Sequence, residues 1–153
     1  MSIVVKDSES IENILADSGV YASVTEGISM RPLFKTHRDM VILKRADGIC
    51  KKYDVVLYRI NSKYILHRII KVDAENGIYL IRGDNTYRTE RVPFDAVIAV
   101  LDSFNRKGKS GKVTDFGYKL YSRLRTFDYP MRYIIRAPYF VARAIYHKLR
   151  SKG

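Results

Sequence analysis

Cysteine and long apolar segments are both scarce in this 153-residue chain. Cys50 is the only cysteine, so no disulfide can form within the chain, and a lone thiol does not suggest a metal cluster. The first residues are too briefly apolar for a signal peptide, and no segment is long and charge-free enough to cross a bilayer. The three histidines lack the spacing of a metal site, so neither a metal nor another cofactor is expected. These absences predict a cytoplasmic protein.

Acidic residues are nearly missing from one end of the chain. Residues 1–102 hold 15 basic and 14 acidic side chains, a net charge of +1, whereas residues 103–153 hold 13 basic and only two acidic ones, a net charge of +11. The net charge of +12 therefore belongs almost entirely to the C-terminal third. This division predicts a neutral body and a cationic tail with a partner of its own.

The body shows mainly β patterns, and its length allows one sizeable core. Residues 7–18 predict a short helix ended by Gly19, which packs on the sheet. Short runs rich in β-branched and aromatic residues follow. The predicted strands are 20–26, 40–45, 54–60, 63–72, 77–82 and 96–101. Short gaps after the third and fourth of these indicate two consecutive antiparallel hairpins.

The predicted organisation has four parts. Residues 1–19 form the N-terminal helix packed on the core, and residues 20–102 form a β domain. A linker rich in Gly, Ser, Lys and Arg covers residues 103–114, and residues 115–153 form a basic amphipathic helical tail. The first tail segment carries an apolar stripe at helical spacing, and the second carries another beyond Pro130. The stripe residues are Phe116, Leu120, Leu124 and Phe127, then Ile134, Val141, Ile145 and Leu149.

Residue types suited to acyl transfer occur in order along the body. Ser29 lies between a predicted strand and Pro32, at a sharp exit from the sheet where its hydroxyl and backbone N–H can face a cleft. Alternation places His67 on the same strand face as Ile65 and Ile69, an apolar setting that lowers its pKa from about 6.5 and keeps it neutral. A neutral imidazole is the form that a general base requires.

Two carboxylates compete for the role of orienting the imidazole. Asp84 follows a predicted strand in Gly83-Asp84-Asn85, and Glu90 lies six residues later. Each candidate also has an ordinary structural interpretation: a turn serine, a core histidine and a turn aspartate. The residues alone do not choose between the two acids.

Together, Ser29-Met30-Arg31-Pro32, Leu66-His67-Arg68 and Gly83-Asp84-Asn85 resemble the superfamily that joins type I signal peptidases with LexA-type self-cleaving repressors, over roughly residues 20–102. Histidine in place of the lysine base is similar to the archaeal and endoplasmic-reticulum signal peptidases. The resemblance implies an antiparallel signal-peptidase/LexA-like β-fold and catalytic roles for Ser29, His67 and Asp84. The chain departs from the family in lacking a membrane anchor or a helix-turn-helix domain.

The expected activity is that of a serine endopeptidase that cleaves leader or signal-type peptides by a Ser-His(-Asp) mechanism. Its partners would be a peptide or preprotein substrate and an anionic membrane surface contacted by residues 115–153, which would place it at the inner face of the membrane. The alternative is a non-catalytic module of the same fold that binds membrane or nucleic acid through the tail. Nucleic acid ranks last, because no nucleic-acid module is recognisable.

Overall fold

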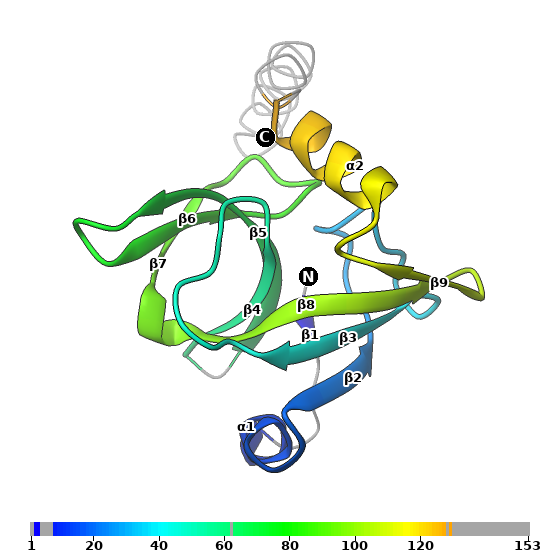
Figure 1. Cartoon of the computed structure of the whole chain (residues 1–153), viewed down its shortest axis with the longest axis horizontal. Helices are drawn as coiled ribbons and strands as arrows, with labels where there is room; N and C mark the ends of the chain where they lie inside the picture. Colours follow the sequence, from blue (N-terminus) through cyan, green and yellow to red (C-terminus); the bar gives the residue numbers. More distant parts are fainter. Residues whose placement is uncertain (1, 4–7, 62, 128, 130–153) are drawn as a thin grey trace, which may run out of the picture.

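Nine strands of the described chain form one antiparallel sheet (Figure 1). The computed structural model describes residues 2–3, 8–61, 63–127 and 129. The strands are β1 (Ser2–Ile3), β2 (Val20–Val24), β3 (Met40–Arg45), β4 (Val55–Ile60), β5 (Lys63–Asp73), β6 (Ile78–Arg82), β7 (Glu90–Pro93), β8 (Val97–Arg106) and β9 (Lys109–Lys112). Their order is β2-β3-β8-β4-β5-β6-β7, with β1 on β5 and β9 on β8. The predicted mainly antiparallel β architecture is confirmed.

The centre of the sheet is the β4–β5 hairpin, in which Val56 pairs with His67 and Tyr58 pairs with Ile65. The first four residues of β4 are all buried, because this strand has a hydrophobic cluster on each of its faces. Val55 and Leu57 belong to the larger cluster, and Val56 and Tyr58 to the smaller one. This double burial explains why β4 is a continuous apolar run without polar alternation.

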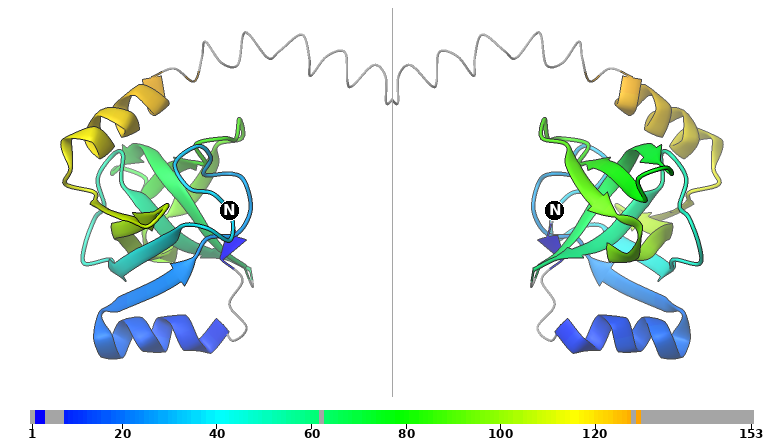
Figure 2. Two further views of the ribbon diagram at one scale, coloured as in Figure 1. Left: turned by 90° about the vertical axis from the view of Figure 1, so that its right-hand side faces the viewer. Right: turned by 90° about the vertical axis from the view of Figure 1, so that its left-hand side faces the viewer.

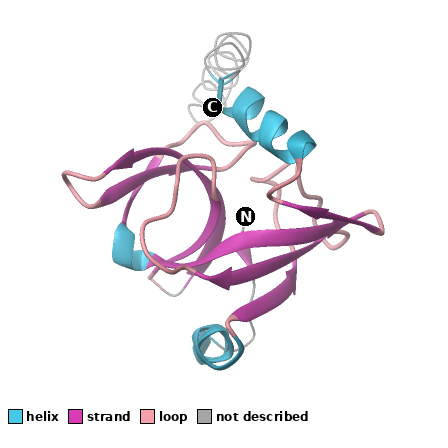
Figure 3. Cartoon of the chain, in the orientation of Figure 1, coloured by secondary structure: helices cyan, strands magenta, loops and turns pink. Residues whose placement is uncertain are grey.

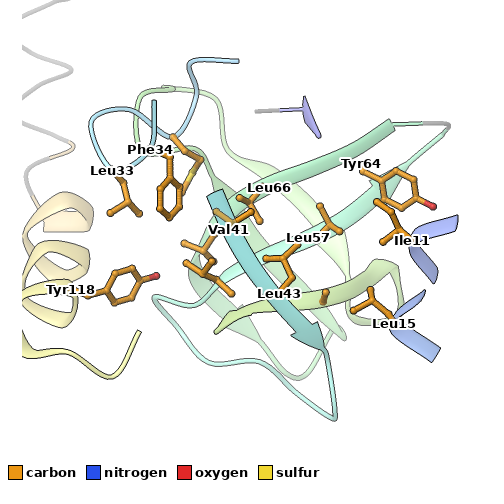
Figure 4. Close-up of a cluster of buried hydrophobic side chains, with 14 residues drawn as sticks. Ile11, Leu15, Leu33, Phe34, Val41, Leu43, Leu57, Tyr64, Leu66 and Tyr118 are labelled. Atoms are coloured by element: carbon orange, nitrogen blue, oxygen red, sulfur yellow. The ribbon is translucent and has the colours of Figure 1, made fainter. Parts of the chain in front are cut away.

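Two helices lie at opposite ends of the β structure, as both views in Figure 2 show. Helix α1 (Ser8–Ser18) inserts Ile11 and Leu15 into the larger cluster and ends at Gly19, whose φ is 72°. Helix α2 (Phe116–Phe127) contributes Tyr118 at the other end of the same cluster (Figure 4). The N-terminal helix packs on the sheet through Ile11 and Leu15. A 3-10 turn, η1 (Phe94–Ala96), joins β7 to β8.

The segment predicted as a linker is part of the sheet instead (Figure 3). Strand β8 continues to Arg106, and a turn at Lys107 and Gly108 leads into β9, which pairs back on β8. The composition of this segment resembles that of a linker because β9 is short and polar, and the strand is defined by its backbone pairing with β8. Residues 130–153, with the second predicted tail segment, lie outside the described residues. None of the helices in the described chain is long and apolar enough to span a membrane.

Candidate active site

Ser29 lies on a tight turn that follows β2 and is held by buried side chains. Gly27 adopts a φ of 82°, a left-handed conformation that glycine accepts without strain. The residues after the serine anchor the turn in the larger cluster: Met30, Leu33 and Phe34 are almost fully buried. The Ser29 side chain stays half-buried. Apolar anchoring on one side of the serine therefore fixes the position of its hydroxyl.

The structure brings Ser29 and His67 into direct contact, as the sequence predicts. The Oγ atom of Ser29 lies 2.9 Å from Nε2 of His67, although the two residues are 38 positions apart. The imidazole is 5% exposed, and this burial lowers its pKa to about 3, an effect that the Asp84 carboxylate partly opposes. His67 is consequently a neutral base at physiological pH.

The other ring nitrogen of His67 contacts a hydroxyl that sequence reasoning missed. Nδ1 lies 3.1 Å from the hydroxyl oxygen of Tyr58, and the Tyr58 hydroxyl donates a 2.5 Å hydrogen bond to Oε2 of Glu90. Burial, followed by the neighbouring Glu90, raises the pKa of Tyr58 well above its usual value, so the phenol stays protonated.

These contacts assign the tautomer of the imidazole. The Tyr58 hydroxyl has one proton and uses it in the hydrogen bond to Glu90. Its oxygen therefore acts as the acceptor for Nδ1–H of His67. Nε2 then carries no proton and presents its lone pair to the hydroxyl of Ser29. This is the arrangement that a general base needs for taking a proton from a serine.

Asp84 lies near the dyad, but its carboxylate is bound by other groups. Both of its oxygens accept hydrogen bonds from Arg68, at 2.8 and 2.9 Å, and the hydroxyl of Tyr121 donates to Oδ2 at 3.0 Å. Arg68 is 1% exposed and also donates to Ser122 in α2 and to the carbonyl of Tyr53. The sequence predicts that Asp84 orients the imidazole. In the structure the Asp84 carboxylate binds Arg68, whereas Nδ1 of His67 contacts Tyr58, which in turn donates to Glu90.

The Gly83-Asp84-Asn85 turn has a structural part in the site. The backbone N–H of Asn85 donates to the carbonyl of Ser29 at 2.7 Å, which ties the two turns together. A Cβ atom on Gly83 would lie 2.7 Å from that carbonyl oxygen and 3.0 Å from Nε2 of His67. Only glycine fits there, and the Arg68 contact holds Asp84 so that the turn stays in place.

The hairpin pattern did contain a signal for Tyr58. A two-residue gap at positions 61–62 sets a register in which Tyr58 lies diagonally across from His67 on the same face. The proximity of Glu90 depends on the further pairing of β7 with β6, where Glu90 lies opposite Ile81. The sequence contains no obvious marker of that second pairing, because β7 has only four residues.

No group of three or more His, Cys, Asp or Glu side chains in the described part of the chain is arranged to hold a metal ion. No family model matches this chain. No curated protein matches it either.

Proposed function

We propose that the protein is a serine endopeptidase in which Ser29 is the nucleophile and His67 the general base. The observation that carries the proposal is the 2.9 Å contact between Oγ and Nε2, with the Nδ1 side of the ring bound by Tyr58. A serine hydroxyl that faces a neutral, correctly tautomerised imidazole is the basic unit of acyl-transfer catalysis. The order of Ser29, His67 and the Gly83-Asp84-Asn85 turn also supports a signal-peptidase-like activity.

The reaction follows from these positions. Oγ of Ser29 attacks the scissile carbonyl while Nε2 of His67 takes the hydroxyl proton, and backbone N–H groups beside Ser29 stabilise the oxyanion. The imidazolium then gives its proton to the departing amine, which leaves an acyl ester on Ser29. Water, deprotonated by the same nitrogen, hydrolyses the ester and regenerates the hydroxyl. Tyr58 and Glu90 stabilise the transient imidazolium through Nδ1.

The proposed substrate is an extended leader or signal-type peptide. Strand β2 stands at one end of the sheet order and runs directly into the turn that carries Ser29. A peptide that adds as a further strand beside this turn would have its backbone hydrogen-bonded and its scissile bond near the nucleophile. As the family resemblance implies, small side chains before the scissile bond would be preferred.

The test is cleavage of a panel of leader and signal peptides, read by mass spectrometry. We expect specific cuts by the wild type that disappear in Ser29→Ala and His67→Ala. Ser23→Ala is the matched control, because Ser23 is a half-buried serine on β2 whose hydroxyl donates to the carbonyl of Val24. Cuts that persist in Ser29→Ala would refute the role of Ser29 as nucleophile, and no cut in any peptide would favour a non-catalytic module of the same fold.

A further inference from the structure

Helix α2 attaches to the body by polar contacts rather than by its apolar stripe. On its inner side Tyr118 and Ser122 are buried, and Arg68 donates to both hydroxyls. The hydroxyl of Tyr121 donates to the carboxylate of Asp84, and Nε of Arg125 donates to the backbone carbonyl of Asp84. These contacts fix which side of α2 faces the sheet.

The apolar stripe of α2 is therefore directed away from the body. Phe116 is 81% exposed, Phe127 84%, Leu124 57% and Leu120 46%. Large apolar side chains at helical spacing on one exposed face are characteristic of a binding surface. We call these four side chains the outer face of α2.

Basic residues accompany this face. Lys119 and Arg123 are exposed and lie one turn apart along the same border of the outer face. Residues 130–153, which follow the helix in sequence, contain six basic residues and no acidic one. The outer face thus has exposed cations beside it on α2, and a cationic stretch follows the helix in sequence.

An open hollow of about 540 Å³ borders the end of the outer face. Three cations line it, namely Lys52, Arg82 and Arg123, together with aromatic residues that include Phe127. The guanidinium of Arg82 lies over the ring of Tyr129, 3.3 Å from its centroid. A cationic hollow that includes Phe127 of the outer face and Arg123 at its border suits an anionic headgroup whose acyl chains lie against that face.

We propose that α2 docks the protein on an anionic phospholipid surface, with its outer face among the acyl chains and a headgroup phosphate in the hollow. The aliphatic residues Leu120 and Leu124 favour lipid over nucleic acid, because they offer no aromatic plane for base stacking. Since the inner side of α2 binds Asp84, docking would place the Ser29 turn close to the membrane. Docking of α2 on a membrane does not require peptidase activity.

The experiment is co-sedimentation of the full chain with phosphatidylcholine vesicles prepared with and without phosphatidylglycerol. We expect binding only when phosphatidylglycerol is present, and weaker binding as salt rises. Leu120→Ser/Leu124→Ser should lower the affinity roughly tenfold or more. Lys52→Ser/Arg123→Ser should lower it roughly 30-fold, at about fivefold per cation.

The matched controls are Val20→Ser and Arg45→Ser, an exposed apolar residue and an exposed cation. Val20 follows Gly19 at the end of α1, and the backbone N–H of Arg45 donates to the carbonyl of Gly19, so both lie beside α1. Both should bind vesicles as the wild type does. The four altered positions, Leu120, Leu124, Lys52 and Arg123, are all exposed, and circular dichroism checks that each variant is folded. Equal vesicle binding by all variants would overturn the proposal, and so would tight binding of a single-stranded oligonucleotide without vesicle binding.

Discussion

Replacing Tyr58 with phenylalanine removes one oxygen atom from behind the candidate base. That oxygen lies between Nδ1 of His67 and the carboxylate of Glu90, at 3.1 and 2.5 Å. Without it, Nδ1–H loses its acceptor, and the ring no longer has a reason to prefer the tautomer with a bare Nε2. The rate of catalysis by Ser29 should therefore fall, although Ser29 and His67 are both still present.

The size of the effect follows from the contact that is lost. A buried polar group left without a partner costs about 1–3 kcal/mol. The same stabilisation is missing in the transition state, where the ring is a cation, so kcat/KM should fall roughly 5- to 150-fold. KM should change little, because Tyr58 is fully buried and lies on the far side of the imidazole from Ser29.

Two measurements test this prediction. Peptide hydrolysis gives kcat and KM, and nitrogen NMR of the His67 ring gives its tautomer even before a substrate is known. Tyr79→Phe is the control, because Tyr79 is equally buried in the same cluster, and its hydroxyl accepts a hydrogen bond from the N–H of Cys50. Only Tyr58→Phe should change the tautomer and the rate. A folded Tyr58→Phe protein with wild-type kcat/KM and an unchanged ring spectrum would refute the assignment.

Three further predictions concern the same site. Because the pKa of His67 is about 3, kcat/KM should not fall near pH 6.5, which a pH–rate profile measures. The free energy of unfolding should decrease by up to roughly 1.4 kcal/mol per pH unit as the pH drops from about 6.5 to about 3, because the unfolded imidazole binds a proton before the folded one does. Denaturant titrations at several pH values measure this decrease. Gly83→Ala should abolish cleavage, whereas Gly117→Ala, with nothing within 4 Å, should leave it intact in the same assay. Arg68→Met should destabilise the fold by about 3–5 kcal/mol in urea, because Asp84 would remain buried without its cation.

The strands were predictable where apolar alternation coincided with turn residues. The β4–β5 hairpin has the register that its two-residue gap predicts, and the Ser29–His67 contact was expected. The β8–β9 hairpin was not expected, because Lys109–Lys112 has no apolar residue and is defined by backbone pairing alone. Helical spacing identified the stripe on α2 but could not say which way it faces.

The inner side of α2 was unpredictable for a related reason. Its buried residues are a tyrosine and a serine, and their partner Arg68 is a charged residue that pattern analysis assigns to the solvent. Burial of Arg68 reverses that assignment, and the helix orients its hydroxyls inward to satisfy the guanidinium. The apolar stripe then has no place in the core.

The same burial explains which partner Asp84 has. His67 and Arg68 are neighbours on β5 and point to opposite faces, so a carboxylate after β6 lies within reach of either. The buried imidazole is stable as a neutral ring, whereas burial of the Arg68 guanidinium would be prohibitive without an anion. Burial alone would lower the pKa of Arg68, but the charge and hydrogen bonds of Asp84 raise it above its ordinary value. The Asp84 carboxylate therefore pairs with Arg68. His67 is connected to a different carboxylate, that of Glu90, through the hydroxyl of Tyr58.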